Sequence, residues 1–330
     1  MTELLQADDA AIARAALFLK QGRLVAFPTE TVYGLGADAK NKEAVRGIFT
    51  AKGRPADHPL IVHIDHSERL EQWAVSIPDT AYRLAERFWP GPLTLILKKR
   101  PDVPDEVTGG QDTIGLRVPN NLVALRLLQA FGSGIAAPSA NRFKRISPTQ
   151  AAHVLEELDG RIDLILDGGP CRVGVESTII DLSGTKPRLL RPGGVEQTEI
   201  ERVLETELVV ITAPSEETPN APGLMAVHYA PTTATQLCPS DRLSITIEQC
   251  RERGQRIGLL CYRYEIQATD SIRIIRLPEH AEKYAQNLYT ALRELDKQHL
   301  DRILVEQPPL SNEWHAIHDR LKKAATAEPV

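Results

Sequence analysis

Cysteine is scarce in this chain and gives no sign of a metal module or a disulfide framework. The four cysteines among its 330 residues are Cys171, Cys238, Cys250 and Cys261, and no two of them form a C-x-x-C pair. We therefore expect neither a zinc module nor a disulfide scaffold. Such cysteine usage fits a reducing compartment, so the sequence predicts a cytoplasmic protein.

Long apolar runs are also absent. The longest early run, Ala15 to Leu19, is shorter than the core of a signal peptide, and no stretch has the length that a bilayer span requires. We therefore expect no targeting segment and no membrane association.

The chain lacks a block of charge of one sign. Its net charge is −5, spread over both halves, so neither half is a basic nucleic-acid arm. An anion site must then be a local group of cations beside turns. Each such cation is also explained as a solvated surface charge, but their repeated placement next to Gly, Pro and Ser favours a common polyphosphate site. They are Lys52, Arg54, Arg117, Arg142, Lys144, Arg145, Arg172 and Arg191.

What the chain does have is enough apolar sequence for two cores. It is 42% hydrophobic, and single cores usually split beyond about 250 to 300 residues. Alternating strand and helix patterns predict an α/β domain over residues 1–211 and a small, largely parallel α/β domain over 233–330. Residues 212–232, rich in Pro, Ser, Glu and Thr, are predicted to be a linker.

The stretch from Pro28 to Gly36 follows a predicted strand and combines hydroxyls, a carboxylate and two glycines. From Gly34 it formally matches the dinucleotide fingerprint G-x-G-x-x-[GA], with Asp57 near the expected distance. In that motif the first glycine ends the strand, whereas here Pro28 to Tyr33 intervene, so nicotinamide or flavin binding is disfavoured. We expect Gly34 and Gly36 to let the backbone turn. No P-loop sequence is present.

Polar residues also follow other predicted elements. Ser139 and Asn141 come after a buried strand, and Ser147 has the position of a cap for a helix predicted over 148–158. Turn and cap roles explain these residues as readily as ligand contacts do. His63, at the end of an apolar strand, is likewise open to a structural explanation. The free N–H groups at the start of the 148–158 helix would favour an anion.

Nine motifs together resemble the YrdC family of threonylcarbamoyl-AMP synthases in its long, two-domain form. That resemblance implies a twisted mixed-sheet YrdC-like catalytic domain, followed by a small Rossmann-like α/β domain. The motifs are Pro28–Gly36, Lys52–Pro55, His58–Leu60, Trp89–Thr94, Arg117–Pro119, Pro138–Asn141, Glu176–Thr178, Arg191–Gly193 and His228–Pro231.

The resemblance implies a reaction in which L-threonine, bicarbonate and ATP give threonylcarbamoyl-adenylate and pyrophosphate. It further implies that a threonylcarbamoyl transferase complex then modifies the tRNA adenosine beside the anticodon. Magnesium is expected to arrive with ATP, because hydrated Mg²⁺ bridging phosphates needs few protein ligands and no carboxylate cluster suggests a dedicated site. Residues around Tyr229 are expected to form a lid that shields the labile anhydride.

The family's site residues carry over by motif position. Lys52 and Arg54 are expected to act electrostatically at the reacting phosphate, with Arg191 assisting. Arg117 is suited to the amino-acid carboxylate, because its guanidinium can hold one bidentately. The threonine pocket would comprise Thr31, His63, Arg117, Ala137 and Ser177. The ATP contacts would be Arg54, His58, Thr113, Ser139, Ser147, Arg191 and Tyr229, with His58 standing where asparagine is more usual.

Two rival classes remain. One is a non-catalytic module that binds tRNA or double-stranded RNA through the same cations. The other is a carbamoyl-handling enzyme of the hydrogenase-maturation type, which would carry an acylphosphatase-like domain and zinc-finger cysteines that this chain does not show.

Overall fold

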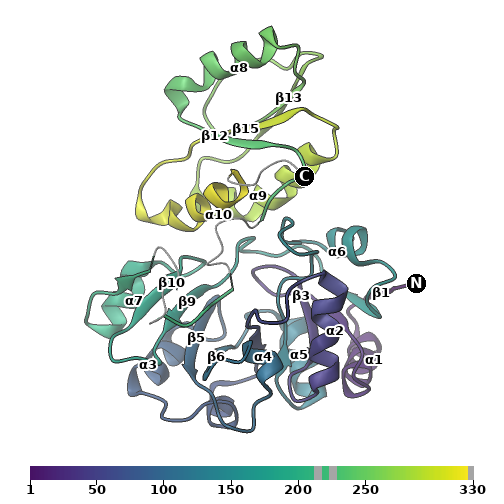
Figure 1. Cartoon of the computed structure of the whole chain (residues 1–330), viewed down its shortest axis with the longest axis vertical. Helices are drawn as coiled ribbons and strands as arrows, with labels where there is room; N and C mark the ends of the chain where they lie inside the picture. The colour runs from purple at the N-terminus through teal and green to yellow at the C-terminus, as the bar shows by residue number, and fades with distance from the viewer. Residues whose placement is uncertain (212–217, 223–228, 326–330) are drawn as a thin grey trace. The chain divides into compact units, whose positions relative to one another are not determined.

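The computed structural model describes residues 1–211, 218–222 and 229–325, which form two compact units. The first unit comprises residues 1–143 and 147–224, and the second comprises 144–146 and 225–330 (Figure 1). Residues 212–217 and 223–228 of the expected linker lie outside the described residues. The domain limits 1–211, 212–232 and 233–330 stay predictions. No helix in the described ranges is long and apolar enough to cross a membrane.

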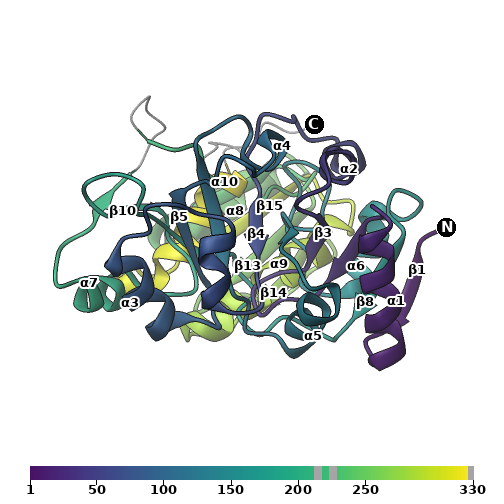
Figure 2. The same ribbon diagram turned by 90° about the horizontal axis from the view of Figure 1, so that it is seen from below.

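The first unit is built on an eleven-stranded mixed sheet, as the sequence predicts. Its strand order is β1-β8-β2-β3-β7-β4-β6-β5-β9-β10-β11, and Figure 2 shows β1 at one edge beside β8. The strands are β1 (Glu3–Gln6), β2 (Val25–Phe27), β3 (Gly34–Asp38), β4 (Ile61–His63), β5 (Leu93–Lys98), β6 (Thr113–Arg117), β7 (Ile135–Ala136), β8 (Leu164–Asp167), β9 (Thr178–Asp181), β10 (Arg188–Arg191) and β11 (Val209–Val210).

Side-chain caps mark the starts of the first two helices of this unit. Asp8 and Asn41 accept backbone N–H groups at the starts of α1 and α2, and Gly53 ends α2 in the left-handed conformation with φ of 62°. The helices are α1 (Asp9–Lys20), α2 (Lys42–Lys52), the 3₁₀ turn η1 (Ser67–Gln72), α3 (Asp79–Phe88), α4 (Asp105–Thr108), α5 (Leu122–Phe131), α6 (Ala151–Leu158) and α7 (Gln197–Leu204).

The two faces of the central strands have different surroundings. On one face Val62, Leu95 and Leu116 join the main core, together with residues of α2, α3 and α7. The opposite face carries Ile61 and Ile96 in a small cluster with Ile179, Leu190 and Ala221. Because side chains alternate along a strand, the residues two positions from these isoleucines also face away from the main core. That second face carries the polar residues of interest.

Gly34 and Gly36 do not form a turn, contrary to expectation. Both lie in β3, which pairs antiparallel with β2. A Cβ on Gly36 would come within 2.8 Å of Ile135 Cγ2 and 2.9 Å of Phe27 Cε1. Glycine is therefore needed at this position for close packing between neighbouring strands rather than for a bend.

One helix start also differs from the prediction, whereas Asn121 caps α5. Helix α6 begins at Ala151 rather than Pro148, and Ser147 donates a hydrogen bond of 2.6 Å to the Glu176 carboxylate instead of capping the helix. The Ser147 hydroxyl thus pairs with the buried carboxylate of Glu176 and not with the backbone N–H groups at the start of the helix.

The second unit is a smaller α/β layer with a wholly parallel sheet, in agreement with the sequence. Its strand order is β12-β15-β13-β14. The elements are β12 (Thr235–Cys238), η2 (Ser240–Arg242), α8 (Leu243–Glu252), β13 (Ile257–Cys261), β14 (Ile272–Arg276), α9 (Ala281–Asp296), β15 (Arg302–Glu306), η3 (Asn312–Trp314) and α10 (His315–Ala325).

Candidate active site

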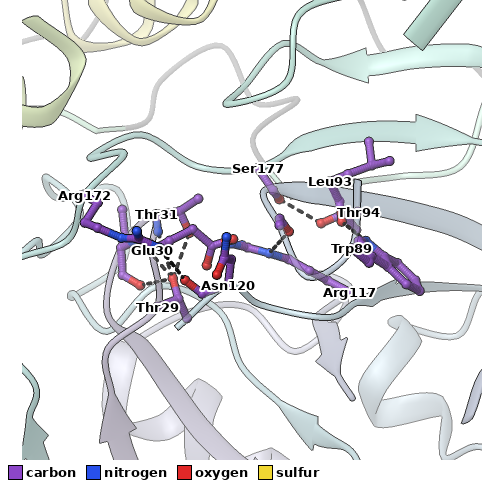
Figure 3. A network of polar contacts seen from close by, with 12 residues as sticks. Thr29, Glu30, Thr31, Trp89, Leu93, Thr94, Arg117, Asn120, Arg172 and Ser177 are labelled. Atoms are coloured by element: carbon purple, nitrogen blue, oxygen red, sulfur yellow. Dashed lines mark hydrogen bonds and ion pairs between the residues drawn. The ribbon is translucent and has the colours of Figure 1, made fainter. Parts of the chain in front are cut away.

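Strand register brings His63 and Arg117 together at the ends of two parallel strands. The two residues are direct partners between β4 and β6, and both are buried. Thr94 of β5 and Ser177, which precedes β9, complete the row, because their hydroxyl oxygens lie 2.7 Å apart. Figure 3 shows Arg117, Thr94 and Ser177 in one polar network with the loop that carries Thr31.

Arg117 is held by two groups. Its Nε donates to the carbonyl of Gly91 at 3.2 Å, and its Nη2 lies 2.7 Å from Glu30 Oε1. Figure 3 shows Glu30 and Arg117 pointing toward one another from the 28–33 loop and from β6. The Nη2 contact is an ion pair at hydrogen-bond distance, and the five N–H groups of a guanidinium exceed the two contacts to Gly91 and Glu30. A buried donor on Arg117 is therefore available to a ligand.

His63 is buried and uncharged. Burial lowers the pKa of its imidazole to about 3, and the nearby Arg117 charge acts in the same direction. Its ring packs edge-on against Phe27 with centroids 6.0 Å apart. Among the described residues Nδ1 of His63 has no hydrogen-bond partner. The ring thus offers a neutral polar group beside a fixed cation.

Arg191 connects Ser177 to the described part of the linker. Its Nε donates to the Ser177 carbonyl at 3.0 Å and its Nη2 to the Ser177 hydroxyl at 3.1 Å. Its Nη1 donates to the carbonyl of Pro222 at 2.9 Å. One guanidinium therefore joins the end of β10, the start of β9 and segment 218–222.

Lys52 occupies the end of α2 and is buried. Its Nζ donates to the Ser139 carbonyl at 2.5 Å and also to the Asn141 carbonyl. Burial lowers the pKa of Lys52 well below its usual value, and the charge of Arg54 lowers it further. Arg54 follows the helix and donates to the Pro59 carbonyl at 3.0 Å. The paired cations expected from the sequence thus lie next to the Ser139 turn.

The remaining predicted residues of the first unit have local partners of their own. Thr31 shares a hydrogen bond of 2.8 Å with Thr29, and Ser139 forms an isolated bridge with Gly34 of β3. The Ala137 N–H donates to the Ile61 carbonyl at 2.9 Å, which ties it to β4. Thr113 begins β6. His58 packs against Phe143 with ring centroids 5.5 Å apart, and burial followed by the Arg54 charge lowers its pKa.

Tyr229 belongs to the second unit, unlike the other predicted ATP contacts. There it is buried, with its ring stacked 5.9 Å from that of Tyr289 and the guanidinium of Arg320 5.1 Å from its centroid. Lys144 and Arg145 belong to the same unit, and Arg145 pairs with Asp296 at 3.1 Å. These two cations thus belong to a different unit from Lys52 and Arg54.

Three buried polar residues of the site were not singled out from the sequence. They are Glu30, Thr94 and Glu176. A signal for Thr94 exists, because it is the one hydroxyl in the otherwise apolar start of its strand, Leu93 to Leu97. Glu30 and Glu176 stand in polar loops, where a carboxylate is ordinarily solvated.

No group of three or more His, Cys, Asp or Glu residues arranged to hold a metal occurs within residues 1–211, 218–222 and 229–325. The polar groups at the site are guanidinium, ammonium, imidazole and hydroxyl groups, together with the carboxylates of Glu30 and Glu176. The cations and hydroxyls suit anions and neutral polar ligands, and the two carboxylates are paired with Arg117 and with Ser147.

Two family models cover most of the chain. Residues 17–193 match the Sua5_yciO_yrdC model, described as telomere recombination. Residues 195–326 match the Sua5_C model, described as threonylcarbamoyl-AMP synthase, C-terminal domain.

Near full-length relatives exist in several organisms. A threonylcarbamoyl-AMP synthase of Pyrococcus abyssi is 44% identical over 319 residues, which cover 94% of this chain and 93% of that protein. One of Bacillus subtilis is 42% identical over 331 residues, with 98% and 96% covered. The crystal structure of P. abyssi Sua5 complexed with L-threonine matches with a TM-score of 0.90 at 43% identity, covering 98% of this chain and 97% of that one.

Proposed function

The chain belongs to the Sua5/YrdC family in its long two-domain form, and we propose that it is a threonylcarbamoyl-AMP synthase. The reaction joins L-threonine, bicarbonate and ATP. The amino nitrogen of threonine bonds to the carbon of bicarbonate to form a carbamate, and water is lost. A carbamate oxygen then bonds to the α-phosphorus of ATP while the bond to pyrophosphate breaks.

The unused buried polar atoms beside Ser177 are the observation that carries this proposal. His63 Nδ1 is buried without a hydrogen-bond partner among the described residues, and the buried Arg117 guanidinium has N–H groups beyond those that meet Glu30 and Gly91. Leaving such groups unpaired is costly, so a ligand with complementary groups gains from pairing them. Threonine offers a carboxylate for Arg117 and a hydroxyl for the neutral imidazole. Thr31, Ala137 and Ser177 would complete this pocket.

Lys52 and Arg54 would serve the phosphate side of the reaction. Both the carbamate and the α-phosphate are anionic, so cations must offset their repulsion and align them. Arg191 would assist at the nucleotide, with further ATP contacts from His58, Thr113, Ser139, Ser147 and Tyr229. Magnesium would enter bound to the ATP phosphates, because the described residues present no donor set of their own for it.

Segment 218–222 supports a lid role for the linker. Ala221 is buried against the second face of the sheet, beside Ile61 and Ile96. Asn220 exchanges two hydrogen bonds with the Gln111 side chain, at 2.6 and 3.1 Å. We propose that this segment helps to exclude water from the mixed anhydride. The product would pass to a threonylcarbamoyl transferase complex for tRNA modification, in the cytoplasm, and direct RNA binding would be secondary to the chemistry.

Pyrophosphate release from ATP tests the assignment. It should require both L-threonine and bicarbonate, and Lys52→Ala or Arg54→Ala should lower the rate by about two orders of magnitude or more. Lys20→Ala, at an exposed position on α1, is the control and should keep the normal rate. Release that needs neither threonine nor bicarbonate would refute the synthase. Salt-sensitive RNA binding without turnover would support the RNA module instead.

A further inference from the structure

Glu30 is a buried carboxylate to which the reaction above gives no role. It lies in the loop between β2 and β3, it is 2% exposed, and its Oε1 is 2.7 Å from Nη2 of Arg117, which is 4% exposed. Carboxylates are seldom buried to this extent unless they are paired. The pair joins a loop residue to the end of a central strand.

The backbone around Glu30 is fixed on both sides. The Thr29 hydroxyl accepts the N–H groups of Thr31 and Val32 at 3.2 Å, which closes a tight local turn. The Glu30 carbonyl accepts the Val173 N–H at 2.7 Å. The carboxylate therefore projects from a rigid loop, and its position is set before any ligand enters.

The guanidinium of Arg117 is consequently held at two points. Gly91 fixes Nε through its carbonyl, and Glu30 fixes the Nη2 side through the ion pair. Glu30 balances the charge at Nη2, and donors remain for a ligand because a guanidinium carries five N–H groups. Removal of Glu30 would take away the ion-pair partner that lies 2.7 Å from this buried cation.

Resting on the proposed function, we propose that Glu30 is a positioning residue that holds Arg117 ready for the carboxylate of the amino-acid substrate. It acts through Arg117 and does not itself contact the substrate. Two opposing effects follow from its charge: it orients the guanidinium, and it repels an incoming carboxylate. The proposal states that orientation outweighs repulsion, because a displaced guanidinium loses both hydrogen bonds to the ligand.

The test is Glu30→Gln, which removes the charge and keeps the size of the side chain. We expect the KM for L-threonine to rise about tenfold or more, while the KM for ATP stays within about twofold. L-Threoninamide, which lacks the carboxylate, should bind the variant and the unchanged protein equally in calorimetry. Glu68→Gln, at a side chain that is 86% exposed, is the matched control and should change nothing.

Each outcome decides the proposal. An unchanged or lower KM for threonine would overturn it, and so would an equal loss of affinity for threonine and threoninamide, which marks general structural damage. If Glu30→Gln does not fold, Glu30→Asp is the second variant, because it keeps the charge but shortens the side chain by one methylene. The KM of Glu30→Asp for threonine should still rise. A normal KM for threonine in Glu30→Asp contradicts the proposal. Failure of the unchanged protein to require threonine at all would instead contradict the proposed function.

Discussion

His63 and Arg117 face each other across adjacent parallel strands, and burial, followed by the charge of Arg117, lowers the pKa of the imidazole and keeps it neutral. Because β4 and β6 end together, a histidine and an arginine that are far apart in sequence form one recognition surface. Neutral His63 can exchange a hydrogen bond with a substrate hydroxyl without adding a second charge to the pocket.

Protein stability should depend on pH through His63. Its pKa in the folded protein is about 3, below the value of 6.5 for a free histidine. The stability linked to its neutral form is therefore fully present above pH 6.5 and is lost as the pH falls toward 3, since only the unfolded chain takes up the proton. From pH 7.5 to pH 5.0 this loss should be about 2 kcal/mol.

Urea unfolding at the two pH values measures this loss. His63→Gln should remove that part of the pH dependence, while His66→Gln, at a half-exposed surface histidine, should retain it. An identical pH dependence in His63→Gln and the unchanged protein would contradict the neutral, buried imidazole.

Ser177→Ala should weaken both the fold and threonine binding. The hydroxyl lies 2.7 Å from that of Thr94 and accepts from Arg191 at 3.1 Å, so its removal leaves two buried groups without this partner. The free energy of unfolding should fall by about 1 to 3 kcal/mol, and the KM for threonine should rise about tenfold. Ser240→Ala in the second unit is the control for the kinetic effect. A normal KM in Ser177→Ala would remove this residue from the threonine pocket.

Gly36→Ala and Gly47→Ala should have opposite consequences. The new methyl at residue 36 would meet Ile135 Cγ2 at 2.8 Å, so the free energy of unfolding should fall by about 1 to 3 kcal/mol. At residue 47, within α2, the nearest atom would be Leu24 Cδ2 at 3.6 Å, and alanine should stabilise the helix by up to about 1 kcal/mol. Denaturant unfolding of both variants compares them directly, and equal destabilisation would contradict the close packing of β3.

Gln111→Ala should act on the reaction and leave the fold intact. Its side chain exchanges hydrogen bonds with Asn220 near the protein surface and also donates to the Thr108 carbonyl at 3.1 Å, so the hold on segment 218–222 is lost together with one local turn contact. We expect turnover to fall a few-fold and the enzyme-bound threonylcarbamoyl-adenylate to hydrolyse faster. Quenched-flow experiments with chromatography of the products measure both rates. Gln72→Ala, at an exposed site in the same unit, is the control and should change neither turnover nor the lifetime of the intermediate. If Gln111→Ala, and also deletion of residues 222–231, left turnover and intermediate lifetime unchanged, the lid proposal would fail.

Local sequence signals predicted much of the fold. Asn41 precedes the apolar spacing of α2 and does cap it, and the alternating pattern of the second unit does form a parallel sheet. Gly34 and Gly36 were wrongly predicted to form a turn, because glycine occurs both in turns and where neighbouring strands pack closely. Which of these applies depends on Phe27 and Ile135, and the latter is a distant neighbour that the local sequence does not reveal.

Candidate site residues were predictable only where a motif carried them. His63 and Arg117 were assigned by resemblance, whereas their shared register depends on β4 pairing with β6, although 53 residues lie between the two positions in the sequence. Glu30 carries no local signal, since a carboxylate in a polar loop is usually solvated. Its burial follows from tertiary packing around Val173 and Arg117.

Mass spectrometry of the product formed from isotopically labelled bicarbonate tests the central claim most directly. With ATP, L-threonine and labelled bicarbonate, the protein should yield threonylcarbamoyl-adenylate that carries the label, in equal amount to the pyrophosphate released. Omission of threonine should abolish both products. Pyrophosphate that forms without a labelled adenylate, or a threonyl-adenylate that lacks the label, would contradict the account.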